Sequence, residues 1–242
     1  MPGSDLGLLD LMREKIVVFT GAGVSAESGL KTFRDMGGYW HQYSIESVAS
    51  PAGWEAHPEA VLAFYNERRK DVLSASPNAA HLAIAALETR FDVVVITQNI
   101  DDLHERAGST NVMHLHGEIL NARSSVDPSL IYRLKSDVID IGHLCEQGSQ
   151  LRPDVVWFGE AVRFMDEAAL AFASASKILT IGTSLSVYPA AGLVDEAKTS
   201  AEKYFVAPEH EYTPLGYRML RGSAAVVVPH VVKCWMAGRK PC

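Results

Sequence analysis

The stretch "KIVVFTGAGVSAES" covers residues 15–28 and joins an apolar run directly to a glycine-rich turn. Gly21 to Ala26 have the form G-x-G-x-x-A, in which glycines let the backbone turn tightly and approach a diphosphate. A helix that starts after such a turn points free N–H groups at that charge. This pattern indicates a nucleotide-binding turn, but it is weak by itself because any turn after a strand can hold two glycines.

The oxidoreductase form of this arrangement needs a second buried strand that ends in an acid about 20 residues later. Glu46 lies near that distance, but residues 35–46 ("DMGGYWHQYSIE") do not have the pattern of a buried strand. The sequence therefore disfavours a dehydrogenase.

Further runs rich in valine and isoleucine follow the first one at residues 91–98, 177–183, 203–208 and 224–229. They lack polar alternation, as strands buried on both faces of a parallel sheet do. Helical patterns lie between them at 57–73, 76–90 and 165–176, the second with Ser76 as the expected N-cap and Pro77 at its first position. The alternation predicts an α/β fold with a Rossmann-like parallel sheet and helices on both faces.

Two regions interrupt this alternation. Residues 36–60 mix glycine, proline and aromatic residues, as a mobile or ligand-covering loop would, and residues 117–152 are polar and irregular. We expect one catalytic domain over residues 1–242 in which 36–60 and 117–152 are a cofactor loop and a small inserted module.

Composition limits the function classes. Lysine and arginine total 22 against 29 acidic residues, a net charge of −7, which disfavours a nucleic-acid binder with a broad basic face. No apolar run approaches the roughly 18 residues that span a bilayer. The three cysteines Cys145, Cys234 and Cys242 share no C-x-x-C spacing and indicate no disulfide framework. These features predict a cytoplasmic protein.

Polar residues gather where the predicted strands end. Gln98, Asn99 and Asp101 follow the run at 91–98, and helix capping would explain only one of them. His114 and His116 lie two apart, so only one would face a shared cleft if the segment is extended, and the one followed by glycine is a candidate general base. Residues 182–184 suit a phosphate or ribose contact, or alternatively a helix N-cap.

Tyr65 and Arg68 are three residues apart on a predicted helix and therefore share a face. A phenol and a guanidinium on one face can hold a carboxylate. The alternative is a solvated basic turn, which the spacing alone favours.

Five motifs, taken in order, resemble the sirtuin family of NAD-dependent protein deacylases. They are "GAGVSAESGLKTFR" (21–34), "TQNIDDLHERAG" (97–108), "HLHGE" (114–118), "RPDVVWFGE" (152–160) and "GTSLSVYPAAGL" (182–193). The resemblance implies a Rossmann-like domain, a smaller module that usually carries zinc, and NAD between the two.

The resemblance also implies roles for single residues. His116 would be the catalytic base, with Asn99 and Asp101 as its catalytic partners at the ribose and carboxamide. The residues expected to bind the cofactor are Gly21, Ala22, Gly23, Ser25, Ala26, Phe33, Arg34, Gln98, Asn99, Ile100, Asp101, Gly182, Thr183, Ser184, Ala207 and Ala224.

For the substrate, the resemblance implies a peptide added as a strand between two edges of the protein, a mode that relies on backbone hydrogen bonds. The Y-x-x-R pair is similar to that of the subclass that removes succinyl and malonyl groups, and a small residue widens the acyl pocket there. The residues expected to bind substrate are Ala49, Tyr65, Arg68, Val156, Phe158, Gly159, Glu160 and Val187.

The chain departs from the family in two places. Between His116 and Trp157 the only zinc-ligand candidates of sulfur or imidazole type are His143 and Cys145, so we predict no zinc. The module would instead rest on apolar packing by Ile119, Leu120, Ile131, Tyr132, Leu134, Val138, Ile139 and Leu144. In addition, Ala207 stands near the position where the family usually has an asparagine for the adenine ribose.

The function predicted from the sequence is NAD-dependent removal of acyl groups from protein lysines, yielding nicotinamide and O-acyl-ADP-ribose. Succinyl and malonyl are the expected groups, with acetyl as a further substrate. Two alternatives remain open: ADP-ribosylation of a protein side chain, and a sensor that binds NAD without turnover.

Overall fold

The computed structural model describes residues 13–31, 45–208 and 212–241. Its larger part is a six-stranded sheet in the order β3-β2-β1-β7-β8-β9, in which every neighbouring pair is parallel. The chain moves from β1 outward to β3 and then returns to the other side of β1 to form β7, so the strand order reverses beside β1. The strands are β1 (Lys15–Thr20), β2 (Asp92–Thr97), β3 (Val112–His114), β7 (Lys177–Ile181), β8 (Glu202–Ala207) and β9 (Arg218–Arg221).

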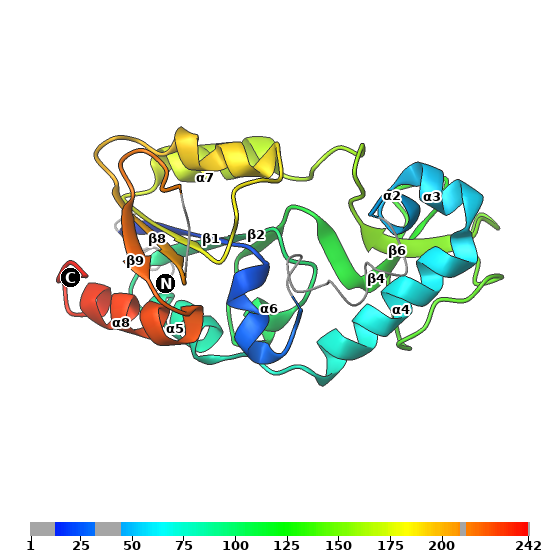
Figure 1. Ribbon diagram of the computed structural model, residues 1–242, viewed down its shortest axis with the longest axis horizontal. Coiled ribbons are helices and arrows are strands. Elements are labelled where there is room, and N and C mark those ends of the chain that lie inside the picture. Colours follow the sequence, from blue (N-terminus) through cyan, green and yellow to red (C-terminus); the bar gives the residue numbers. More distant parts are fainter. Residues whose placement is uncertain (1–12, 32–44, 209–211, 242) are drawn as a thin grey trace, which may run out of the picture.

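Helices cover both faces of this sheet (Figure 1). On one face α5 (Ala79–Leu87) and α8 (Ala224–Met236) pack against Ile16, Val18 and their neighbours. On the other face α7 (Met165–Ser174) and the 3-10 helix η4 (Ala190–Glu196) pack against Val17, Phe19 and Phe205. Burial of alternate strand residues on opposite faces explains why the runs are apolar throughout, and the predicted α/β class is confirmed.

A smaller module lies beside the carboxyl ends of the strands (Figure 1). It contains an antiparallel sheet in the order β5-β4-β6, formed by β4 (Gly117–Ser124), β5 (Ile131–Arg133) and β6 (Leu151–Val155). Three helices, α2 (Ile45–Val48), α3 (Pro51–Ala56) and α4 (Pro58–Ser74), pack against it. The short elements η1 (Ala22–Val24), η2 (Ala26–Ser28) and α6 (Leu103–Arg106) lie in the loops after β1 and β2.

The prediction of a strand at 224–229 is wrong, because these residues form the first half of α8. Val228, Val231, Val232 and Trp235 are buried at helical spacing. A short apolar run cannot distinguish a buried strand from a buried helix, and this run was assigned from its valine content alone. The last strand of the sheet is β9, in which two arginines flank Met219 and Leu220, and no strand was predicted there.

Two boundary predictions are also wrong. The N-cap of α5 is Asn78, not Ser76: its side chain accepts a hydrogen bond from Ala80 N at 2.9 Å, and its own N–H donates to His81 Nδ1 at 3.3 Å. The described part of the predicted loop, residues 45–60, is mostly helical, and residues 36–44 lie outside the described residues. Glu46 belongs to α2 of the small module rather than to an edge of the main sheet.

The inserted module has more order than its polar sequence indicated. Of the residues expected to pack its interior, Ile119, Leu120 and Ile139 are buried, whereas Ile131 and Leu144 are exposed. Hydrogen bonds from Asn66 and Arg69 of α4 support the module as well. None of the helices in the described ranges combines the length and apolar character needed to cross a membrane.

Candidate active site

The turns after β1 and β7 touch each other through glycine. Gly21 N donates to Ile181 O at 3.0 Å, and Gly23 N donates to Gly182 O at 2.8 Å. A Cβ atom on Gly23 would lie 2.7 Å from Gly182 Cα, and Gly182 has a φ of +61°, which favours glycine. The two turns can approach this closely only as glycines, and their contact builds one edge of the site.

A buried polar cluster forms where the loops after β1 and β2 meet. Asn99 Nδ2 donates to Ser25 Oγ at 3.1 Å, and Ser25 Oγ donates to Asp101 Oδ2 at 3.0 Å. Burial raises the pKa of Asp101, while hydrogen bonds from Leu103 N and Ser25 oppose that shift. The sequence placed Ser25 in one motif and Asn99 and Asp101 in another, and the fold connects their side chains.

The loops after β2 and β7 are joined in the same way. Gln98 Nε2 donates to Thr183 Oγ1 at 3.0 Å, and Leu185 N donates to the same oxygen at 3.1 Å. Ser184 Oγ lies 2.6 Å from Ser186 Oγ. The ends of β2 and β7, the strands on either side of β1, thus bring amide and hydroxyl groups to one edge of the sheet, beside the point where strand order reverses.

His116 follows β3 and lies at the same edge of the sheet. Its Nδ1 is 2.9 Å from Gln98 O. Because a carbonyl oxygen only accepts hydrogen bonds, Nδ1 must carry the ring proton, which leaves Nε2 with a free electron pair. Burial lowers the pKa of His116, so the ring is neutral near pH 7. A neutral imidazole with this tautomer can act as a general base.

His114 is in a different environment. Its Nδ1 is 3.1 Å from Asn99 O, and its Nε2 forms an ion pair with Glu105 Oε1 at 2.7 Å. Burial by itself lowers the pKa of His114, but the hydrogen bond and charge of Glu105 outweigh it and the net shift is upward. Both nitrogens are bound within the protein, so of the two histidines only His116 is placed to act as a base.

The module side of the site contains Tyr65 and Ala49. Both are buried in one apolar cluster with Trp157, whose Nε1 donates to the Tyr65 hydroxyl at 3.1 Å. Burial raises the pKa of Tyr65 to about 12. The guanidinium of Arg68 lies 4.9 Å from the Phe64 ring centre. Its positive charge lowers the pKa of Tyr65, against the larger upward shift from burial. A fully solvated turn is therefore ruled out for Tyr65.

The segment after β6 links the module to the main sheet. Val156 N donates to His116 O at 2.9 Å and Phe158 N donates to Ala49 O at 3.0 Å. The side chain of Phe158 and the backbone of Gly159 are exposed. Val187, expected on the opposite edge, is half-buried in the loop after β7. Phe158 and Gly159 are thus the exposed part of this segment.

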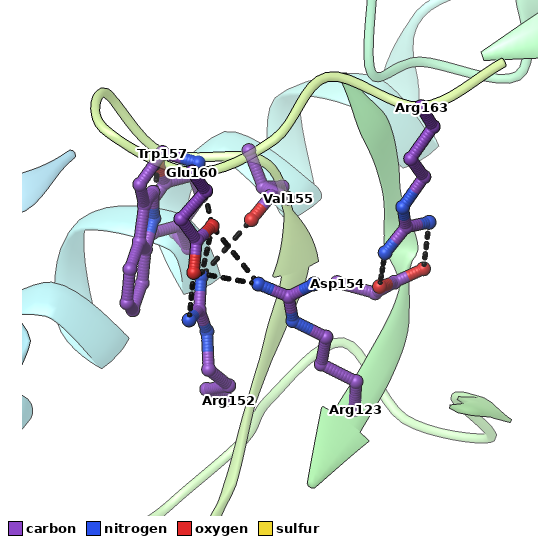
Figure 2. Close-up of polar contacts among 8 residues, drawn as sticks. Arg123, Arg152, Asp154, Val155, Trp157, Glu160 and Arg163 are labelled. Atoms are coloured by element: carbon purple, nitrogen blue, oxygen red, sulfur yellow. Dashed lines mark hydrogen bonds and ion pairs between the residues drawn. The ribbon is translucent and has the colours of Figure 1, made fainter. Parts of the chain in front are cut away.

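The carboxylate of Glu160 is engaged within the protein. It accepts hydrogen bonds from Arg123 and Arg152 and from Trp157 N (Figure 2). Figure 2 also shows a separate pair between Arg163 and Asp154. The sequence prediction of Glu160 as a substrate contact did not foresee these arginines. The only sequence signal was Arg152 at the start of "RPDVVWFGE".

The remaining predicted residues lie as follows. Ala207 ends β8 and its carbonyl accepts from Gly222 N at 3.1 Å, while Ala224 is buried at the start of α8. Ile100 is half-buried, and its carbonyl accepts from Ile119 N of the module at 2.9 Å. Ala22 and Ala26 lie in η1 and η2. Phe33 and Arg34 fall outside the described residues.

Sequence reasoning missed Glu27. Its Oε1 accepts from Ala225 N in the first turn of α8 at 2.9 Å, which ties η2 to that helix. Within the ranges that the structure describes, no group of three or more His, Cys, Asp or Glu side chains could hold a metal ion.

Residues 21–189 match the model of the Sir2 family. The chain belongs to the Sir2 family. A relative from Helicobacter pylori named NAD-dependent protein deacylase is 51% identical over 196 residues, which are 81% of this chain and 85% of the relative. A crystal structure of a Sir2 homolog–NAD complex superposes with a TM-score of 0.84 at 37% identity, covering 98% of this chain and 95% of the other. A Sir2–p53 peptide–NAD⁺ structure gives 0.76 at 29% identity, with coverage of 98% and 99%.

NAD is the cofactor that this Sir2-family site fits. Gly21, Gly23 and Gly182 let the turns after β1 and β7 pack against each other at the end of the sheet where folds of this kind bind a dinucleotide. The Asp101 carboxylate can accept from ribose hydroxyls, and the amide groups of Gln98 and Asn99 suit a carboxamide or a ribose. The donor and acceptor set is therefore complementary to a dinucleotide.

Proposed function

We propose that this Sir2-family enzyme is an NAD-dependent protein-lysine deacylase that prefers acidic acyl groups such as succinyl and malonyl. The observation that carries the preference is the burial of Tyr65, with its hydroxyl in the module cluster and Arg68 on the same helix. Removal of the acyl group would release nicotinamide, O-acyl-ADP-ribose and the free lysine side chain.

The part played by the protein follows from its donors and acceptors. NAD would supply the electrophilic ribose carbon that receives the acyl oxygen. Asn99 and Asp101, fixed to each other through Ser25, would orient the ribose and exclude alternative poses. His116 Nε2 would take the proton from a ribose hydroxyl, because Nδ1–H is already donated to Gln98 O.

The acyl-lysine would enter between the module and the main sheet. A peptide lying along the segment at residues 156–160, of which Phe158 and Gly159 are exposed, with Val187 opposite, would be held by backbone hydrogen bonds and would tolerate many sequences. Ala49, a small residue in the same buried cluster as Tyr65, would let an acyl chain lie beside the phenol.

An acidic acyl group would be stabilised in two ways. With its pKa raised to about 12, Tyr65 stays protonated near neutral pH and can donate a hydrogen bond to a carboxylate. The Arg68 guanidinium adds a positive charge. A purely apolar pocket would instead reject a carboxylate, because burying an unpaired charge is costly.

The test compares peptides of one sequence that carry acetyl-, succinyl- or malonyl-lysine, each incubated with NAD and followed by mass spectrometry. We expect a larger kcat/KM for the succinyl and malonyl peptides than for the acetyl peptide. Faster acetyl removal would overturn the acyl preference. Release of nicotinamide with all three peptides intact would overturn deacylation and favour ADP-ribosylation, and the absence of any turnover would favour a sensor.

A further inference from the structure

The hydrogen bond between Trp157 and Tyr65 has only one possible direction. An indole nitrogen donates and does not accept, so the Tyr65 oxygen is the acceptor at 3.1 Å. The proton of the Tyr65 hydroxyl is then left for a different acceptor. Among the hydrogen bonds of the described residues, none uses this proton.

The Trp157 ring is itself held firmly. It is 2% exposed, and the Arg152 guanidinium lies 3.1 Å from the centre of its ring. Arg152 Nη1 donates to Glu160 Oε1 at 2.7 Å, and Arg152 Nη2 donates to Val155 O at 3.0 Å. Trp54 packs against the indole with ring centres 5.8 Å apart.

The backbone of Trp157 is fixed by the same carboxylate. Trp157 N donates to Glu160 Oε2 at 2.8 Å, and Arg123 Nη2 donates to both oxygens of Glu160 at 2.9 Å (Figure 2). Glu160 thus fixes the ring through Arg152 and the main chain directly. The two guanidiniums and the one carboxylate of this cluster carry one net positive charge. The charge of Arg152 favours the ionised form of Tyr65 and so lowers its pKa, against the larger effect of burial.

We propose that Trp157 is a positioning residue for acyl selectivity. Its indole N–H occupies the Tyr65 oxygen and so turns the Tyr65 proton toward the carboxylate of an acidic acyl group, while Glu160 and Arg152 hold the indole in place. The inference rests on the proposed preference for acidic acyl groups and adds to it a residue that acts through Tyr65. Without the indole donor the hydroxyl could rotate, and its proton would lose its fixed direction.

The decisive variant is Trp157→Phe, which keeps an aromatic ring and removes the N–H. We expect the ratio of kcat/KM for succinyl-lysine to that for acetyl-lysine peptide to fall about fivefold to tenfold, the effect of weakening one hydrogen bond to a charged acceptor. The fall should come mainly from a higher KM for the succinyl peptide. Trp54→Phe is the matched control, since no described hydrogen bond joins Trp54 to Tyr65, and it should leave the ratio within twofold.

A double-mutant cycle with Tyr65→Phe separates positioning from a general packing effect. In the Tyr65→Phe background, Trp157→Phe should not lower the ratio further, because there is no hydroxyl left to orient. Equal losses for both peptides, or an undiminished effect of Trp157→Phe in the Tyr65→Phe background, would overturn the inference and leave the proposed function standing. A wild-type protein that prefers acetyl peptides would overturn both.

A spectroscopic measurement tests the contact without turnover. The indole ¹H–¹⁵N resonance of Trp157, assigned by its loss in Trp157→Phe, should move upfield in proton shift in Tyr65→Phe as the hydrogen bond is lost. An unchanged resonance would contradict the bond on which the inference depends.

Discussion

At the scale of single residues, one contact with a backbone carbonyl determines which nitrogen of His116 can accept a proton. The sequence offered two histidines, and spacing could say only that they point to opposite sides. The carbonyl of Gln98 fixes the proton on Nδ1 of His116, whereas both nitrogens of His114 are bound within the protein. The tautomer, and not the residue type alone, makes His116 the candidate base.

We expect His116→Tyr to fold as the parent does and to lower kcat by about 10²- to 10⁴-fold, the usual contribution of a general base. The check is steady-state kinetics with the preferred acyl peptide, together with circular dichroism for the fold. Retained turnover in a folded variant would place the base on another residue.

The pH dependence of the parent follows from the same residue. Burial lowers the pKa of His116 below its ordinary value of 6.5, and the base works only when unprotonated. The value of kcat/KM should therefore be flat near neutral pH and fall tenfold per pH unit only below pH 6.5. A profile that already falls between pH 8 and 7 would contradict a neutral, buried imidazole.

At the scale of elements, helix α4 supports the small module through polar side chains. Arg69 is fully buried, and its Nε donates to Ile119 O at 2.7 Å while its Nη1 donates to Asp137 O at 3.1 Å. Asn66 exchanges hydrogen bonds with both the N–H and the carbonyl of Ile139. Burial lowers the pKa of Arg69 to about 10, which reflects its desolvation. These contacts join α4 to β4 and to the loop before β6.

Replacing Arg69 by Met should loosen the module more than the main sheet. The carbonyls of Ile119 and Asp137 would lose their donor, at a cost of about 1–3 kcal/mol in the free energy of unfolding. Hydrogen–deuterium exchange should rise in β4 and at residues 137–139 and stay unchanged in β1 and β2. Lys70→Met, an exposed change on the same helix, is the control, and equal exchange in the two variants would refute this support.

At the scale of the whole molecule, buried histidines connect the site to global stability. His81 of α5 and His104 of α6 are fully buried with ring centres 4.9 Å apart, and the nitrogens His81 Nε2 and His104 Nδ1 have no partner. His104 Nε2 contacts Thr20 Oγ1 at the end of β1. Burial lowers the pKa of His81 to about 4 and that of His104 well below its ordinary value.

Acid should therefore destabilise the fold. His81 binds a proton below about pH 6.5 when unfolded but only near pH 4 when folded, so its contribution is present above pH 6.5 and is lost as pH falls toward 4. From pH 7 to pH 5 the loss from His81 alone is roughly 2 kcal/mol. Urea unfolding of His81→Gln should show a weaker dependence on pH than the parent, whereas exposed His57→Gln should match the parent. Identical slopes in all three proteins would contradict a neutral buried His81.

The sequence predicted most of this architecture at the level of local pattern. Valine-rich runs identified β1, β2, β7 and β8, because parallel strands buried on both faces must be apolar along their whole length. The same rule failed at 224–229, where an apolar run of equal character became α8. Local composition indicates that a segment is buried, but its conformation depends on the elements that pack against it in space.

The sequence by itself determined which chemical groups this protein has and the strand ends at which they occur: the glycine turn, the amides and carboxylate at 98–101, and His116. Only the tertiary structure decided how they are paired. It joined Ser25 to Asp101, Glu160 to Arg123 and Arg152, and Trp157 to Tyr65. The physical reason is the sequence distance over which each preference acts. Strand and turn preferences depend on residues that are close along the chain, whereas these contacts depend on how elements far apart in the sequence pack together.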